Sequence, residues 1–140
     1  MSTNWFKDMQ DMHVKYGVNK WVQAEKQSDV EVKRFNDYMD FRLDMMQEEL
    51  DETRNAFVNK DPEEMVDGII DLCVFAIGTL EVFGVDANKA WDEVYKANMN
   101  KEVGIKEGRP NPLGLPDLVK PKDWKGPSHE DNHGNISDSF

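Results

Sequence analysis

Hydrophobic side chains recur every three to four residues through most of the first hundred positions, a spacing that predicts successive α-helices. A first helix is expected from residue 4 to about residue 16, where Gly17 stops it. A shorter and less regular stretch begins at Trp21 and ends near residue 29. The longest helices are expected after this stretch.

A long helix is predicted over residues 29–58. Its apolar stripe, at steps of three, four and seven, consists of Phe35, Met39, Leu43, Met46, Leu50 and Phe57. The start of the next helix is explicit, because Asp61 is a good N-cap, Pro62 suits the first helical position and Glu64 completes a capping box. From there to Gly84 the helix is apolar nearly all round, so we expect it to be central and buried.

A fourth helix is expected from Asp86 to about residue 103, with Gly104 at its end. Prolines and glycines then preclude a long helix, and residues 105–125 predict an extended arm packed on the helical domain of residues 1–104. Its candidate anchors are Leu113, Leu115, Leu118, Val119 and Trp124. Residues 126–140, rich in Ser, Asp, Asn, His and Gly, are expected to form a disordered tail.

These elements predict an all-α fold, an antiparallel four-helix-type bundle with an extended Pro-rich C-terminal arm. A core this small should be completed by a partner. The apolar stripe of the long helix and the outer sides of Trp91 and Tyr95 point to homo-oligomerisation, as a homodimer or a dimer-of-dimers tetramer.

Composition narrows the function classes. A chain of 140 residues with a net charge of -11 fits one domain and argues against binding a nucleic acid polymer. No apolar run is long enough to span a membrane, and the first residues lack a basic segment followed by an apolar core. A cytoplasmic location without membrane attachment is therefore expected. Cys73 is the single cysteine, so no intrachain disulfide forms.

Two acidic clusters interrupt the apolar pattern on neighbouring helices. They comprise Glu48, Glu49 and Glu52 on the long helix, and Glu64, Asp67 and Asp71 on the apolar helix. Asp71 lies about 40° around the helix from Asp67, and Glu49 can converge with Glu52 on one ion. An antiparallel helix pair would bring the clusters together. Because carboxylates are rarely buried unless they are paired or metal-bound, we expect a shared hard divalent cation.

Plainer interpretations of these acids remain open. The aspartates of the apolar helix would also be satisfied by Lys or Arg of a neighbouring element, and Glu48 and Glu52, taken alone, fit a solvated face. A di-iron carboxylate bundle is disfavoured, since the one Glu-x-x-His spacing, Glu130 to His133, falls in the expected tail. The sequence contains no Walker A loop, Rossmann glycine fingerprint or zinc-type Cys/His grouping.

Four segments carry further motifs: an EExxE helix at residues 41–52, a second acidic helix at 67–72, an SNMSK-like segment at 94–101 and a Lys-Pro arm at 119–124. In this order they resemble the all-α nucleoside-triphosphate pyrophosphohydrolase superfamily, which includes MazG-like enzymes, dimeric dUTPases and phosphoribosyl-ATP pyrophosphohydrolases. The resemblance covers about residues 35–122. It departs at Gly68, which stands three before Asp71 where an ExxD motif has Glu, so Glu64-x-x-Asp67 fits as well.

The resemblance implies hydrolysis of a (d)NTP between its α- and β-phosphates, giving a (d)NMP and pyrophosphate. It implies that Mg²⁺, or Mn²⁺ in its place, is held by Glu49, Glu52, Asp67 and Asp71. Glu48 and Glu49 are the implied catalytic residues, with Glu48 as general base for the attacking water or as a further ligand.

The resemblance also implies substrate-binding residues near the end of the fourth helix and on the arm. They are Asn98, Lys101, Arg109 and Lys120. Asn98 would bond the sugar or base and the three cations the phosphates, although each also fits an ordinary helix-surface or loop position. The runner-up function is a MazG-like helical scaffold that binds nucleotide or a protein partner without hydrolysis. Uracil, cytosine and guanine deoxynucleotides are all compatible with these residues.

Overall fold

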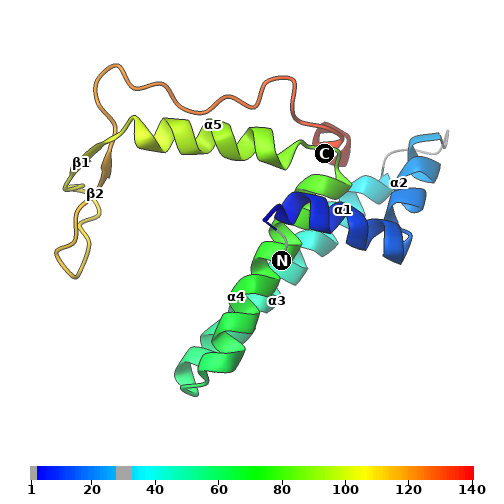
Figure 1. Ribbon diagram of the computed structural model, residues 1–140, viewed down its shortest axis with the longest axis horizontal. Helices are drawn as coiled ribbons and strands as arrows, with labels where there is room; N and C mark the ends of the chain where they lie inside the picture. Colours follow the sequence, from blue (N-terminus) through cyan, green and yellow to red (C-terminus); the bar gives the residue numbers. More distant parts are fainter. Residues whose placement is uncertain (1–2, 28–32) are drawn as a thin grey trace. The chain divides into compact units, whose positions relative to one another are not determined.

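The computed structural model describes residues 3–27 and 33–140, which are mainly helical (Figure 1). The elements in chain order are α1 (Trp5–Tyr16), α2 (Val18–Gln27), α3 (Lys33–Val58), α4 (Pro62–Val82), α5 (Ala87–Met99), β1 (Glu102–Gly104), β2 (Asp117–Val119) and the 3₁₀-helix η1 (Ile136–Ser139). They form two compact units, Met1–Ala87 with His133–Phe140 (unit 1) and Asn88–Asn132 (unit 2). The helical domain expected over residues 1–104 is thus divided near the start of α5.

Local capping explains where α1 and α4 begin and end. The Asn4 side chain accepts a hydrogen bond from the Lys7 backbone N–H, and Asp61 accepts one from Glu64 in the same way. Gly17 and Gly84 follow their helices with φ of +77° and +74°, a conformation that disfavours side chains. The predicted boundaries of these two helices are confirmed.

Other elements differ from the pattern-based expectation. Residues expected to be less regular form the ten-residue helix α2, which starts directly after the Gly17 turn. The fourth helix stops at Met99 rather than near residue 103, because the next residues form β1 and pair antiparallel with β2. A three-residue strand is too short to show a period-2 pattern, so the sequence carried no signal for this ladder. The proposed start of the long helix at residue 29 lies outside the described residues.

Two antiparallel helices, α3 and α4, form the axis of unit 1 (Figure 1). A tight link joins them, in which Lys60 adopts φ of +58° and the Asp61 N–H donates to the Ala56 carbonyl at 2.9 Å. α1 packs against α4, where buried His13 contacts the Glu81 carboxylate through its Nδ1 atom. The antiparallel pairing of the two acidic helices, predicted from the short link, is confirmed.

The hydrophobic core lies where α2, the start of α3 and the end of α4 meet. Phe83 is fully buried there, and its ring lies 6.0 Å from Phe35 and 6.2 Å from Tyr38 between ring centroids. Ile136 of η1 packs against this cluster, and the Asn36 amide donates to the Ser139 carbonyl. The segment expected to be a disordered tail therefore includes an ordered turn, because its single Ile side chain reaches the core.

The expectation that α4 is central and buried does not hold within one chain. Val66 and Ile69 of α4 are 65% and 49% exposed. α3, α1 and, to a small extent, α2 cover only part of the circumference of α4, and Val66 and Ile69 lie on the face that stays exposed. No single helix of the described chain is long and apolar enough to cross a membrane, and α4 and α5 together reach that length only across the break at residues 83–86.

Arg42 is a buried cation that joins α3 to α4. Its Nε donates to the Thr79 hydroxyl at 2.9 Å, one terminal nitrogen donates to the Phe75 carbonyl at 3.0 Å, and its Cζ lies 5.0 Å from the Phe75 ring centroid. The Thr79 hydroxyl donates to the same carbonyl. The Arg42 side chain is thus committed to helix packing.

Replacing Arg42 with Lys should destabilise the protein by about 1–3 kcal/mol, because an ammonium group cannot make both hydrogen bonds with the geometry of a guanidinium. The midpoint of urea unfolding measures this loss. Arg54→Lys, an exposed position on the same helix, is the control and should leave the midpoint unchanged. Equal midpoints for the two variants would contradict the structural role of Arg42.

Candidate functional site

Four carboxylates from α3 and α4 surround a fifth, that of Glu49. Burial of its side chain raises the pKa of Glu49 above its ordinary value, and the negative charges of four neighbours raise it further. In order of effect these neighbours are Asp71, Glu52, Glu48 and Asp67. Both acidic clusters seen in the sequence therefore act on the same carboxyl group, as the antiparallel arrangement predicted.

A glycine allows the two helices to approach at the level of these acids. A Cβ atom built on Gly68 would lie 2.3 Å from the Thr53 hydroxyl and 3.3 Å from the Thr53 Cβ, so a side chain at Gly68 would collide with α3. Thr53 in turn donates its hydroxyl to the Glu49 carbonyl at 2.8 Å. The close approach thus occurs one turn from Glu49 on α3 and directly beside Asp67 on α4.

The cluster is not neutralised by basic residues. Within residues 3–27 and 33–140, no ion pair or side-chain hydrogen bond joins the five carboxylates to a donor. The nearby Arg42 points to Thr79 and Phe75 instead. The interpretation of Asp67 and Asp71 as ion-paired structural residues therefore has no support in the described part of the chain.

Exposure divides the cluster into two sets. Glu48, Glu52 and Asp67 are exposed, whereas Glu49 and Asp71 are half-buried. The exposed glutamates agree with the solvated-face interpretation, but they lie near enough to Glu49 to raise its pKa. Four uncompensated negative charges around the partly desolvated Glu49 carboxyl group repel it and one another, and a cation is the simplest relief.

The side chains of this cluster are chemically suited to bind a hard divalent cation. All five side chains offer carboxylate oxygens, the ligands that Mg²⁺ and Mn²⁺ prefer, and two helices supply them. As placed, no three acidic, His or Cys side chains of the described residues form a ready coordination group. The site thus shows the charge and the atoms for a metal but not a closed coordination shell.

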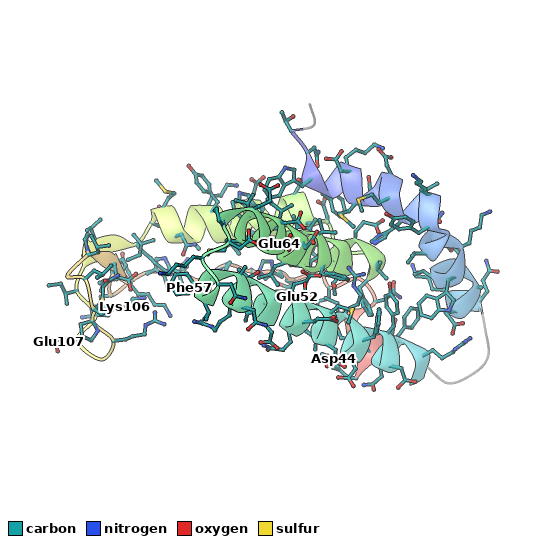
Figure 2. The ribbon with its side chains drawn as sticks, turned by 90° about the horizontal axis from the view of Figure 1, so that it is seen from below. Asp44, Glu52, Phe57, Glu64, Lys106 and Glu107 are labelled. Atoms are coloured by element: carbon teal, nitrogen blue, oxygen red, sulfur yellow. The ribbon has the colours of Figure 1, made fainter. Side chains whose placement is uncertain are left out.

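The sequence left open whether Glu64 or Asp67 is the first acid of the motif on α4, and the structure distinguishes the two residues. Asp67 contributes to the raised pKa of Glu49, and Glu64 does not. Glu64 lies in the first turn of α4, where its backbone N–H is bonded to the Asp61 cap (Figure 2). Glu52 projects from α3 in the same view. The geometry therefore favours Asp67 and Asp71 as the acids of α4.

The four candidate substrate residues all belong to unit 2, which is described by itself. Asn98 lies half-buried in the last turn of α5, and Lys101 follows two residues after that helix ends. Lys120 directly follows β2. The Leu118 backbone N–H, which donates to the Asp117 carboxylate, does most to lower the pKa of Asp117, and the charges of Lys106 and, last, Arg109 lower it further. Arg109 therefore lies near an acid of its own unit.

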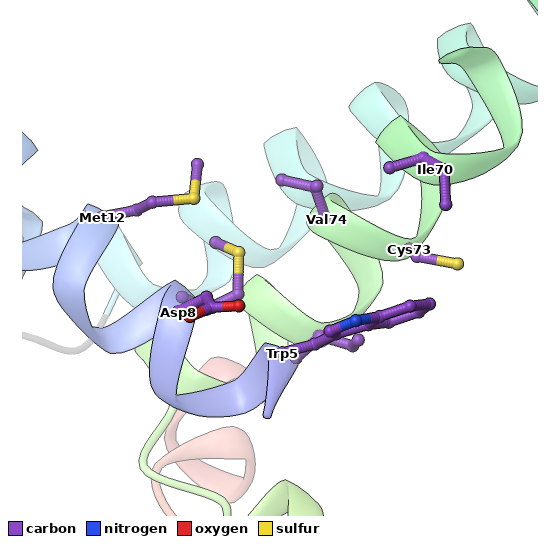
Figure 3. A pocket seen from close by; sticks show the side chains of 8 residues that line it. Trp5, Asp8, Met12, Ile70, Cys73 and Val74 are labelled. Carbon is purple, nitrogen blue, oxygen red and sulfur yellow. The ribbon is translucent and has the colours of Figure 1, made fainter. Parts of the chain in front are cut away.

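A separate pocket of about 210 Å³ lies between α1 and α4. It is lined mainly by apolar side chains, and the Trp5 ring extends toward Cys73 and Ile70 (Figure 3). Asp8 is its one carboxylate. The α4 residues that line it lie about 90° around the helix from Asp67 and Asp71. The pocket thus opens on a different face of α4 from the acids.

Two features of the sites were not recognised from the sequence. Gly68 was read as a departure from the ExxD motif, although a glycine inside an apolar helix is itself a signal of close packing. Trp124 was expected only as an apolar anchor, yet the ammonium groups of Lys101 and Lys120 each lie 5.1 Å from its ring centroid. No local sequence pattern could have shown that second arrangement.

Comparison with known proteins identifies one family. The family model described as phosphoribosyl-ATP pyrophosphohydrolase matches residues 19–98, more than half of the chain. The matched residues include all five carboxylates and Asn98, and they end before Lys101 and the arm. No curated protein matches the chain.

Removing the charge of Glu49 should stabilise the metal-free protein near neutral pH. A carboxyl group whose pKa is raised by folding is a destabilising anion, and this penalty grows as the pH rises through the ordinary glutamate range. In EDTA at pH 7.5, Glu49→Gln should raise the melting temperature by about 1–4 °C.

The difference should vanish near pH 3.5, where Glu49 is protonated in both states. Thermal unfolding followed by circular dichroism checks both conditions. Glu107→Gln, at an exposed loop position, should shift neither value. A lower melting temperature for Glu49→Gln at pH 7.5 would count against the repulsive cluster.

Proposed function

Because this chain belongs to the phosphoribosyl-ATP pyrophosphohydrolase family, within the all-α nucleoside-triphosphate pyrophosphohydrolase superfamily, we propose that it is a Mg²⁺-dependent enzyme that cleaves (d)NTPs between the α- and β-phosphates. Family membership indicates a pyrophosphohydrolase-type activity on nucleotides. The metal, the triphosphate substrate and the products, a (d)NMP and pyrophosphate, are our proposal.

One observation carries the proposal. Four carboxylates from two helices surround Glu49 with no basic partner among the described residues, and burial together with their negative charges raises the pKa of Glu49. A scaffold without a charged ligand would be more stable without this mutual repulsion, because nothing in it would compensate the clustered negative charge. Retaining the carboxylates is reasonable where a cation and a polyphosphate must be held.

The proposed roles divide among the acids. Glu49, Glu52, Asp67 and Asp71 would hold the divalent ions, Mg²⁺ or Mn²⁺. When bound, these ions would neutralise phosphate charge and lower the pKa of a ligated water. Glu48, exposed beside Glu49, would accept the proton of the attacking water as general base, or serve as a further ligand. Glu49 is proposed both as a catalytic residue and as a metal ligand, because the other four carboxylates lie close enough to raise its pKa.

Recognition of the substrate is proposed for polar residues of unit 2. Lys101, Lys120 and Arg109 would contact the phosphates, and Asn98 would donate to and accept from the sugar or base. The resemblance of their segments to family motifs supports these roles, together with the lysine positions on the Trp124 ring. Arg109 has the weaker case, since it already lies near Asp117.

Activity should appear as pyrophosphate release that requires Mg²⁺. We would measure it across the common NTPs and dNTPs, dUTP and phosphoribosyl-ATP, with the matching monophosphate as second product. Asp71→Asn and Glu49→Gln should each lower turnover by about 10²–10³-fold, because each removes charge stabilisation of the transition state. Asp44→Asn, an exposed acid on α3, is the control and should keep full activity.

The outcomes separate two functions. Full turnover in folded Asp71→Asn and Glu49→Gln proteins would refute the proposed site. Absence of product across the panel, with metal and nucleotide still bound in calorimetry, would instead favour the non-catalytic scaffold. Product with one nucleotide only would identify the base.

We also propose that the protein self-associates, as a homodimer or a tetramer. Large apolar side chains stay exposed on both helices that carry the acids, including Leu50 and Phe57 on α3 and Val66 and Ile69 on α4. Light scattering should give at least twice the chain mass of 16.2 kDa. Ile69→Glu should shift the protein toward the monomer, and Val103→Glu, at an exposed position on β1, should not. A monomeric wild-type protein would refute the proposal.

A further inference from the structure

Two lysines in unit 2 face each other across a strand pair. In the antiparallel ladder Glu102 pairs with Val119, so the next position outward in the register sets Lys101 opposite Lys120. Like charges placed opposite each other on neighbouring strands are destabilising. This arrangement needs a compensating contact.

The ring of Trp124 provides that contact. The Lys101 and Lys120 ammonium nitrogens each lie 5.1 Å from the centroid of its ring, within the range of a cation–π interaction. No carboxylate takes this role, because neither lysine forms an ion pair with another of the described residues. The neighbouring Lys106 differs, since it pairs with Asp117 at 3.5 Å. The two ring-bound ammonium groups therefore keep their N–H donors available to an anion.

The ring itself is fixed by the end of a helix. The indole N–H of Trp124 donates to the Ala97 carbonyl at 2.7 Å. That carbonyl lies in the last turn of α5 and has lost its helical partner, because the Lys101 N–H bonds to Asn98 instead. A turn in which the Trp124 N–H donates to the Pro121 carbonyl at 3.0 Å brings the indole back toward the helix. The ring position is thus set by backbone atoms.

We propose that Trp124 is a positioning residue, which holds Lys101 and Lys120 as a preorganised pair for the polyphosphate of the substrate. The identity of that anion rests on the proposed function. Lysine side chains lose considerable rotamer freedom when they bind a ligand, and holding them beforehand lowers that cost. Trp124 acts through the two lysines and does not touch the reacting atoms.

The test is binding of inorganic tripolyphosphate to the full-length protein in EDTA, measured by calorimetry. Trp124→Leu should weaken binding about tenfold, and Trp124→Phe, which keeps an aromatic face, should weaken it about twofold. Tyr16→Leu is the matched control, since Tyr16 is an aromatic residue of α1 that is 65% exposed. It should leave the affinity unchanged.

A double-mutant cycle separates positioning from general packing. In a Lys101→Met/Lys120→Met background, Trp124→Leu should change the affinity less than twofold, because the groups through which it acts are gone. An equal loss in both backgrounds, or no loss in the wild-type background, would overturn the proposal. If circular dichroism shows that Trp124→Leu is unfolded, Trp124→Phe takes its place in the cycle. It should weaken binding about twofold in the wild-type background and leave it unchanged in the lysine-free background, and equal effects in the two backgrounds would overturn the proposal.

Failure of the positioning role of Trp124 can be told apart from failure of the proposed hydrolytic activity. If nucleotide hydrolysis occurs, Trp124→Leu should raise KM with little change in kcat, and an unchanged KM would overturn the role of Trp124. If no nucleotide is hydrolysed but tripolyphosphate binding follows the cycle above, the proposed activity fails and the lysine pair stands as an anion site.

Discussion

The approach of α3 to α4 at Gly68 is the constraint on which the acidic site depends. Only a residue without a side chain leaves room for Thr53 at that point, and the acids lie within about one turn on either side. If the helices were held farther apart, Coulomb repulsion among the carboxylates would weaken and so would any joint grip on an ion. The same closeness that makes a cation site possible makes the metal-free helix pair electrostatically unfavourable.

Other contacts hold the pair together against that repulsion. The aromatic cluster around Phe83 joins the start of α3 to the end of α4, and the buried Arg42 bonds the two helices between the core and the acids. The hydrophobic core thus lies toward one end of the helix pair and the acids lie further along it. This separation allows polar function without a buried charge in the core.

Charge is divided unequally between the two units. Residues 88–132 contain eight acidic and eight basic side chains, so the net charge of -11 belongs entirely to unit 1. The acids of unit 1 suit a cation, and the lysines held by Trp124 in unit 2 suit an anion. Each unit by itself therefore carries one of the two kinds of charge that the proposed metal-dependent hydrolysis of a polyphosphate would use.

Local signals were sufficient for much of the fold. The Asp61 cap, the Gly17 and Gly84 stops and the short link after α3 act within a few residues, so their pattern alone predicted the helices and the antiparallel acidic pair. Patterns failed where distant residues decide. The tail contributes Ile136 to the core, and three-residue strands form a ladder with no periodicity of their own.

The candidate site shows the same division. The sequence by itself determined the helices, the acidic residue types on their faces and the family motifs, because these depend on composition and on spacing along one element. Only the tertiary structure decided that Asp67 rather than Glu64 acts on Glu49, that Arg42 is used for packing and that Trp124 holds two lysines. Each of these depends on a distance between residues far apart in the chain, and such distances are set by packing.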